Sequence, residues 1–229
     1  MNETTARSGY TPGPVALSSV TMDIRAPRYT DVPLPPYRYR PGEHPHPTAH
    51  RDGYSYRPPG APAPNVRYRA PEQWRQSRDY LYGCDLYNHA YWWEAHEAWE
   101  GLWQLTDKTG VQGRFLQGLI QVSACHLKAE IGHWRGVGNL RARSGRYLEF
   151  VLAGIDESTF MGLNLRQWHR AADRYLARLL EPGGDRRHDP AAYPYLVLEM
   201  PASGASERLG QGSTDELSSH GPNQAPQRQ

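Results

Sequence analysis

Hydrophobic residues recur at helical spacing between about residues 73 and 180, and this pattern sets the expected fold. The clearest case is the segment 165–180, where apolar residues follow one another at intervals of three and four positions, as on the buried face of an amphipathic helix. No alternating pattern of useful length, which would indicate a strand, occurs in this part of the chain. We therefore predict an all-α fold, a compact bundle of four to five antiparallel helices joined by short connections. The expected helices cover residues 73–87, 91–105, 111–131, 135–152 and 165–180.

The segments on either side of this region differ from it in composition. Thirteen of the 20 prolines lie in residues 1–70, whereas all seven tryptophans lie between Trp74 and Trp168. Proline at this density excludes helix and central strand, so the chain before the helices should be extended. Seven tyrosines in the same 70 residues leave two alternatives open, an arm docked on the bundle and a free proline-rich tail. We divide the chain into a disordered leader (1–32), a Pro/Tyr-rich extended arm (33–70), the helical bundle domain (71–182) and a tail that is extended and then disordered (183–229).

Composition excludes several classes of protein. No run of about 18 apolar residues occurs, so no membrane partner is expected, and two cysteines, Cys84 and Cys125, are too few for a disulfide scaffold. The first residues show no secretory signal, so we expect a cytoplasmic protein with reduced thiols. The formal net charge is only +2, and the arginines are spread along the chain without a basic stripe. Nucleic acid is therefore not an expected partner, while homo-oligomerisation is left open.

The segment 91–103 carries the most unusual chemistry, because charged residues lie among its tryptophans. At about 100° per residue, with Glu94 at 0°, His96 lies at about 200° and Glu100 at about 240°. Both fall within the tryptophan stripe, which we take as the buried face, whereas Glu97 lies at its edge and Glu94 farthest from it. We therefore predict that His96 and Glu100, one helical turn apart, point inward. The stripe consists of Trp99 at about 140°, Trp92 at about 160°, Trp103 at about 180° and Trp93 at about 260°.

An imidazole and a carboxylate buried among indoles require polar partners. The next predicted helix offers them on one narrow stripe, and we expect its Gln117 and Gln121 to face His96 and Glu100. Arg114 on the same stripe should pair with a glutamate, which would keep that carboxylate ionised. On this hypothesis Glu100→Ala destabilises the protein by several kcal/mol, since it strands a buried partner.

Three interpretations of this polar cluster stay open. The first is a satisfied polar network in a structural interaction module without a ligand. The second is a site for a small polar molecule in a ligand-binding or accessory protein. The third is a divalent metal site formed by His96, Glu97 and Glu100, in a metal-dependent hydrolase-like enzyme with one of the glutamates as base. The candidate ligand-binding residues are Asn88, Glu94, His96, Glu97, Glu100, Trp103, Arg114, Gln117 and Gln121.

Known motifs do not decide among these interpretations. The zinc-protease pattern H-E-x-x-H fails because its fifth position is Glu100. A second metal-binding histidine on the next helix is also missing from the expected face, because His126 lies about 120° away from Arg114 of the polar stripe. No catalytic residue and no known cofactor is assigned from the sequence.

The stretch Asp85-Leu-Tyr-Asn-His-Ala-Tyr-Trp-Trp-Glu-Ala-His-Glu-Ala-Trp-Glu-Gly-Leu-Trp103, followed by Arg114-Phe-Leu-Gln-Gly-Leu-Ile-Gln121, resembles the family called domain of unknown function 309. The resemblance covers about residues 76–153, and the arm with its Pro-His-Pro sequence is similar to the N-terminal extension of a bacterial branch of that family. It implies a compact helical bundle and brings no established activity, substrate or cofactor. The nine candidate residues are its motif positions. Trp92 and Trp93 stand where the family would have Phe or Tyr, which implies a tighter local pocket.

Overall fold

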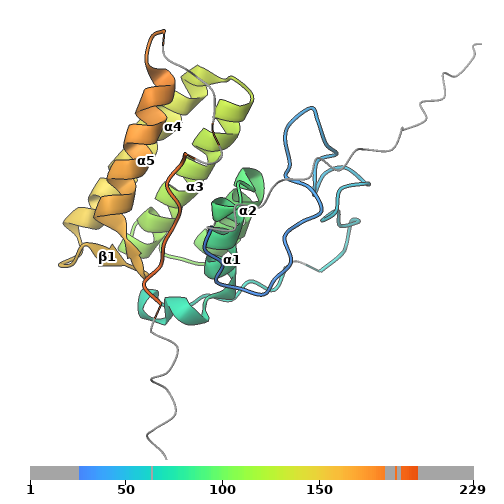
Figure 1. Cartoon of the computed structure of the whole chain (residues 1–229). Coiled ribbons are helices and arrows are strands. Elements are labelled where there is room, and N and C mark those ends of the chain that lie inside the picture. Colours follow the sequence, from blue (N-terminus) through green and yellow to red (C-terminus); the bar gives the residue numbers. More distant parts are fainter. Residues whose placement is uncertain (1–25, 63, 184–188, 190–191, 201–229) are drawn as a thin grey trace, which may run out of the picture. The chain divides into compact units, whose positions relative to one another are not determined.

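The computed structural model describes residues 26–62, 64–183, 189 and 192–200, and it confirms the all-α fold (Figure 1). Within the described chain, residues up to Leu198 form one unit. Its elements are a 3-10 helix, η1 (Pro71–Gln76), the α-helices α1 (Arg78–Asn88), α2 (Trp92–Trp103), α3 (Val111–Glu130), α4 (Trp134–Ala153) and α5 (Leu165–Leu180), and the strands β1 (Thr159–Phe160) and β2 (Leu163–Asn164).

Four of the five predicted helices begin and end within two residues of their expected bounds. The first does not, because the predicted helix 73–87 is divided at Ser77, whose ψ of 88° is not helical. Residues before this break form η1, and residues after it form α1. Apolar periodicity runs across both pieces, so the break could not be read from the pattern.

Helices that follow one another in the sequence pack together: α1 on α2, α2 on α3, α3 on α4 and α4 on α5. Small residues permit the closest of these contacts. A Cβ atom at Gly118 of α3 would lie 2.3 Å from the Leu148 side chain of α4, and one at Gly83 of α1 would lie 2.2 Å from the Trp99 indole of α2. The bundle therefore depends on glycine at two helix crossings.

A two-residue hairpin between α4 and α5 was not expected from the sequence. Phe160 pairs with Leu163 across a turn in which Met161 and Gly162 both have positive φ, 47° and 78°. Strands of two residues are too short to show an alternating pattern. Leu198 forms an isolated bridge with Leu163, so the short extended piece expected near the end of the described chain lies beside β2.

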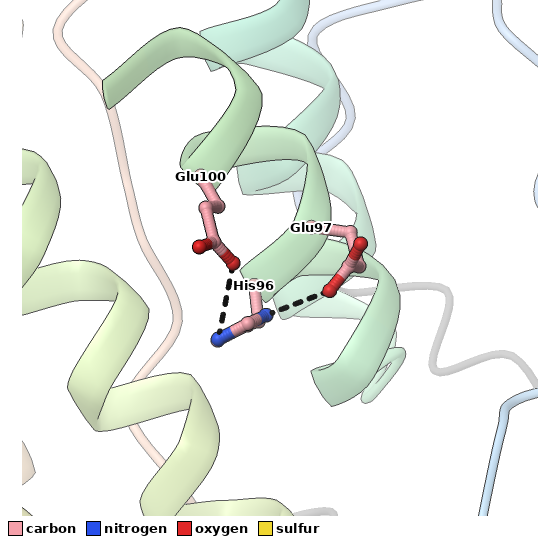
Figure 2. Close-up of side chains that lie close together, drawn as sticks. All are labelled: His96, Glu97 and Glu100. Carbon is pink, nitrogen blue, oxygen red and sulfur yellow. Dashed lines mark hydrogen bonds and ion pairs between the residues drawn. The ribbon is translucent and has the colours of Figure 1, made fainter. Parts of the chain in front are cut away.

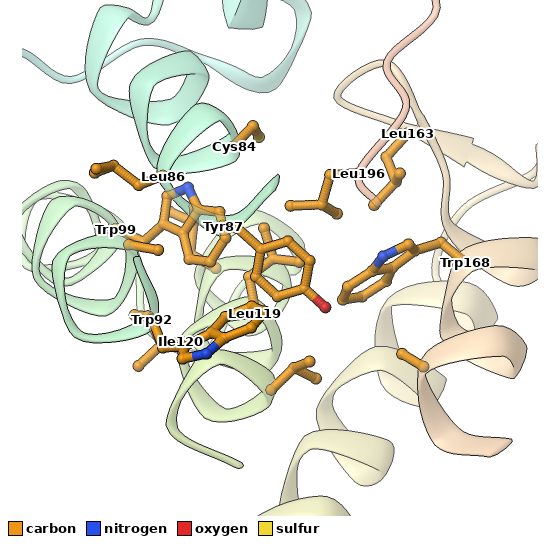
Figure 3. Close-up of a cluster of buried hydrophobic side chains, with 14 of the residues drawn as sticks. Cys84, Leu86, Tyr87, Trp92, Trp99, Leu119, Ile120, Leu163, Trp168 and Leu196 are labelled. Atoms are coloured by element: carbon orange, nitrogen blue, oxygen red, sulfur yellow. The ribbon is translucent and has the colours of Figure 1, made fainter. Parts of the chain in front are cut away.

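The core is a continuous cluster of aromatic and aliphatic side chains from all the α-helices (Figure 3). Tyr87 lies near its centre and contacts the rings of Trp92, Trp99 and Trp168. His126 belongs to the same cluster: its ring is fully buried, stacks on Trp92 at 4.1 Å between centroids, and its Nε2 lies 3.1 Å from the Tyr87 hydroxyl. His126 is therefore a core histidine in this fold.

The segments before and after the helices contact the bundle. Residues 26–62 run over α1 and α2, where the blue trace of Figure 1 lies. From here on, the arm means these residues, in place of the range 33–70 expected from the sequence. Residues 26–32, which the sequence places in a leader, belong to this contact, while residues 1–25 of that leader lie outside the described residues. At the other end, Tyr193, Leu196 and Leu198 are buried in the core, and the expected disordered part of the tail from residue 201 onward lies outside the described residues. None of the helices in the described part of the chain has the length and hydrophobicity needed to cross a membrane.

Candidate functional site

The predicted orientation of α2 is wrong for the residues on which the sequence interpretation depends. His96 and Glu100 do not point into the core, because their side chains retain 29% and 41% of their accessible surface. Glu94, expected to lie farthest from the buried face, is 5% exposed. The buried carboxylate of α2 is therefore Glu94 rather than Glu100.

The error comes from treating the tryptophans as markers of the core. Ala95 and Leu102 are fully buried along with Trp92 and Trp99, and on the same wheel these four residues average about 120°. His96 therefore lies about 80° from the centre of the buried face, and Glu100 about 120° from it. Trp93, which widened the apparent stripe, is only partly buried and is covered by Tyr39 and His46 of the arm.

The polar stripe of α3 also faces a different neighbour from the one predicted. Ser123, whose hydroxyl donates to the Trp92 carbonyl at 2.7 Å, marks the side of α3 that faces α2. Arg114 lies about 180° away from Ser123. Its guanidinium lies over the rings of Tyr147 and Phe150 in α4, and it forms no ion pair with a glutamate in the described part of the chain.

The two glutamines lie on the Arg114 side of α3, with Gln117 about 60° and Gln121 about 20° from Arg114. Among the described residues, no hydrogen bond joins either of them to His96 or Glu100. Gln121 is 9% exposed, and its Oε1 has no partner among the described atoms. Trp103 is partly buried and carries the Lys108 ammonium 4.5 Å above its ring.

Asp85 anchors the first part of the arm. Its carboxylate is fully buried in the last turn of α1 and accepts hydrogen bonds from the amides of Tyr29 and Thr30, at 2.6 and 3.0 Å. The Thr30 hydroxyl donates to the same carboxylate at 2.6 Å, and Arg28 Nε lies 3.4 Å away. The buried charge is thus neutralised by donors from one short segment of the arm.

Asn88, at the end of α1, joins the arm to the tail. Its Nδ2 donates to the carbonyls of Pro27 and Leu196, at 3.3 and 2.9 Å, and its Oδ1 accepts from the Leu196 amide at 2.7 Å. The Tyr193 hydroxyl donates to the Asn88 carbonyl at 2.8 Å. One family-motif residue therefore fixes two segments that are far apart in the sequence.

Glu94 holds the middle of the arm. Its Oε1 accepts a hydrogen bond from the Tyr39 amide and another from the Tyr54 hydroxyl, both at 2.8 Å, while Oε2 has no hydrogen-bond partner among the described atoms. Burial raises the pKa of Glu94 above its ordinary value, and these hydrogen bonds and the charge of Arg38 oppose that rise in part. Both groups that donate to the Glu94 side chain come from the arm, which is why a helical wheel could not place it.

Two tyrosines of the bundle donate hydrogen bonds to proline carbonyls of the arm. Tyr82 Oη donates to the Pro33 carbonyl at 2.9 Å, and Tyr91 Oη donates to the Pro35 carbonyl at 3.1 Å. Further along, Glu130 at the end of α3 lies near two arginines of the arm, 3.6 Å from Arg38 and 3.8 Å from Arg40. Neither these tyrosines nor Glu130 was among the candidate residues, and no local pattern identifies them.

His96, Glu97 and Glu100 form a second, separate cluster on the outer side of α2 (Figure 2). His96 Nδ1 lies 3.2 Å from Glu97 Oε1, and Nε2 lies 3.7 Å from Glu100 Oε2. One ligand atom from each of the three residues lies within 4.8 Å of the other two. The structure therefore brings the predicted metal ligands together, on a partly exposed surface.

Comparison with known proteins identifies part of the chain. Residues 80–140 match the family model described as Domain of unknown function (DUF309), which confirms the resemblance to that family for these residues. The match includes all nine candidate residues and spans most of α1, all of α2 and α3 and the start of α4. No curated protein and no solved structure matches the chain. The similarity to the DUF309 family is thus found in residues 80–140.

Proposed function

We propose that the face formed by α1 and α2 is a binding surface for extended, proline-rich polypeptide, and that the chain's own arm occupies it. The proposal rests on the hydrogen-bond partners of the polar side chains on that face. Asp85, Glu94, Asn88, Tyr82 and Tyr91 all make hydrogen bonds to main-chain amides or carbonyls of the arm. This proposal differs from the interaction module expected from the sequence, which had no ligand, because here the surface holds a polypeptide segment.

Contacts to the main chain favour a conformation more than a particular set of side chains. The Tyr82 and Tyr91 hydroxyls reach carbonyls two residues apart, at Pro33 and Pro35, which requires an extended backbone. Proline holds the backbone in that form before binding, so little entropy is lost on docking. Aromatic grooves that bind proline-rich segments use the same physical principle.

The arm and the bundle belong to one chain, so the arm competes with any external peptide. A tethered segment acts at an effective concentration in the millimolar range for short flexible linkers. An external proline-rich segment therefore binds measurably only when the tether is cut. This property also makes the proposal testable on the whole protein.

The experiment places a site for a sequence-specific protease at Gly60, an exposed position with nothing within 4 Å of a Cβ atom built on it. After cleavage, a fluorescent label on the arm reports its dissociation upon dilution and its exchange for a synthetic peptide of residues 26–60. We expect the cleaved arm to remain bound at micromolar concentration and to exchange with the synthetic peptide but not with a scrambled one. An arm that leaves the bundle above about 100 µM, or one that fails to exchange, contradicts the proposal.

A pair of variants separates recognition from general stability. Tyr82→Phe together with Tyr91→Phe removes two hydrogen bonds to the arm, each worth about 0.5–1.5 kcal/mol, so the dissociation constant should rise by about tenfold. The matched control is Tyr147→Phe on α4, whose ring contacts Arg114 and not the arm. If the double variant and the control change the dissociation constant of the arm equally, the Tyr82 and Tyr91 hydroxyls do not contribute to binding of the arm.

A second candidate function, divalent metal binding, has the His96, Glu97 and Glu100 cluster in its favour. Histidine with two carboxylates is a donor set that zinc accepts, and a fourth position would remain for water. All three residues act as ligands in this arrangement, so no carboxylate of the cluster is left to serve as a general base. For this reason we propose metal binding at the cluster, and not the hydrolase-like reaction.

Metal binding is tested by isothermal titration of the full chain with Zn²⁺ and by elemental analysis of the dialysed product. We expect one ion per chain, lost in His96→Ala and kept in His50→Ala, the control on the exposed part of the arm. Equal stoichiometry in the two variants, or no bound ion in the unaltered protein, would remove this candidate.

A further inference from the structure

The arginines of α4 and α5 gather in three dimensions although they are spread along the sequence. The two helices carry eight arginines and two carboxylates, a formal net charge of +6. The whole chain carries +2, so the rest of it carries −4. Charge is therefore strongly segregated toward one pair of helices.

A groove of about 580 Å³ runs between these helices. Arg166, Arg170 and Arg174 line it from α5, and Arg146 lines it from α4. These four side chains are exposed, and none has a hydrogen bond or an ion pair within the described part of the chain. Four guanidinium groups thus line the groove without a neutralising partner among the residues that the structure describes.

The other ionisable groups of the groove offset little of this charge. Arg141 is bound to Asp173 by a bidentate ion pair, with distances of 2.7 and 2.8 Å, so these two residues neutralise each other. Glu149 is exposed at the edge, and His169 is partly buried. Burial lowers the pKa of His169, with smaller opposing effects from Asp173 and Glu149. The groove retains a net positive charge around its four unpaired arginines.

We propose that the α4–α5 groove binds the phosphodiester backbone of nucleic acid without reading its bases. Guanidinium groups bind phosphate oxygens in pairs and do so more specifically than ammonium groups. Backbone phosphates supply a row of such groups, and their binding requires no sequence information. The groove lies outside the matched family segment, which ends at residue 140, so it is a feature of this chain beyond that segment.

The shape of the arginine array favours a long polyanion over a single phosphate group. Arg166, Arg170 and Arg174 are four residues apart, so each step along α5 rises about 6 Å and the row spans about 12 Å. Apart from His169, the residues lining the groove are not aromatic, so no platform for base stacking is present among them. Contacts should therefore go to the backbone alone, with no sequence preference.

The test uses the full chain and fluorescence anisotropy with a labelled 20-base-pair DNA duplex. We expect a dissociation constant of about 1–100 µM that rises steeply with salt and is equal for two unrelated sequences. The variant Arg166→Gln/Arg170→Gln/Arg174→Gln should weaken binding at least tenfold. It should also lower the slope of log K against log salt by about 2–3, since each phosphate contact contributes about 0.9.

Two further variants make the outcome decisive. Lysine at the same three positions keeps the charge and should restore most of the affinity. The matched control, Arg51→Gln/Arg67→Gln/Arg78→Gln, removes three exposed arginines elsewhere and should change the dissociation constant less than twofold. An equal loss in both glutamine variants would show a response to net charge alone and would overturn the proposal.

Two more probes identify the source of the phosphate. A single-stranded RNA of the same length should also bind, because the proposed contacts require only a phosphodiester backbone. Binding of inorganic polyphosphate without binding of either oligonucleotide would overturn the assignment to nucleic acid. Absence of anisotropy change with all three probes would overturn it as well.

Discussion

Replacement of Asp85 by alanine provides the sharpest test of how the arm is held. The fully buried carboxylate accepts three hydrogen bonds from Tyr29 and Thr30 and lies beside Arg28. Hydrogen bonds to a charged group are worth about 1.5–3 kcal/mol each, so a simple sum gives about 4.5–9 kcal/mol. The loss should be smaller, because the freed arm can leave the bundle and its donors can bind water. We expect about 3–5 kcal/mol, the usual cost of removing one partner of a buried charged group.

Two measurements on the full chain test the effect of replacing Asp85 by alanine. Urea denaturation gives the loss of global stability, and hydrogen exchange gives the opening of the arm at the Tyr29 and Thr30 amides. A loss of 3 kcal/mol corresponds to exchange more than about 100-fold faster at these amides. The control is Asp156→Ala, at an exposed position between α4 and β1. Unchanged protection of both amides, with a stability change below about 0.5 kcal/mol, would refute the role assigned to Asp85.

Three further predictions concern α1 and α2. Glu94→Ala strands the Tyr39 amide and should cost about 1–3 kcal/mol in urea denaturation, whereas Glu94→Gln keeps an acceptor and should cost less. Because burial raises the folded-state pKa of Glu94 above its ordinary value of 4.5, its favourable contribution is complete at low pH and is lost as the pH rises through the folded-state pKa, so stability relative to Glu94→Gln should fall as the pH rises above about 4.5. Glu100→Ala should change the unfolding free energy by less than about 1 kcal/mol, since Glu100 is partly exposed, and a loss of several kcal/mol would restore the inward orientation. Gly83→Ala should cost about 1–3 kcal/mol in thermal unfolding, because the new Cβ would lie 2.2 Å from the Trp99 indole nitrogen.

Apolar periodicity was sufficient to place the helices because each helix buries one face along its whole length. The bounds of α5, Leu165–Leu180, agree with the prediction at both ends. The same reasoning could not detect the break at Ser77, since the residues on both sides of it are buried against the same core. The apolar pattern of a segment indicates which of its sides is buried. It does not indicate a break in the helix when the residues before and after the break are buried on the same side.

The orientation of α2 shows a different limit of sequence reasoning. Tryptophan is large and amphipathic, so it is often partly covered at a surface and is a weaker marker of the core than alanine or leucine. Ala95 and Leu102 point to the true buried face, and weighting them equally with the tryptophans would have moved His96 to its edge. The burial of Glu94 could not be found in this way, because its partners Tyr39 and Tyr54 are 55 and 40 residues distant.

Two family-motif residues, Asn88 and Glu94, and the nearby Asp85 have hydrogen-bond partners outside the matched segment, and this bears on how these positions are interpreted. Asp85, Asn88 and Glu94 lie within residues 80–140, yet the groups that satisfy them come from the arm and from the tail. A buried polar group without its partner is costly, so each of these residues makes physical sense only together with a segment that docks on it. In this chain the docking segments are covalently attached. On the proposal that this face binds the arm, Asp85, Asn88 and Glu94 form one half of an interface whose other half is the docked segment.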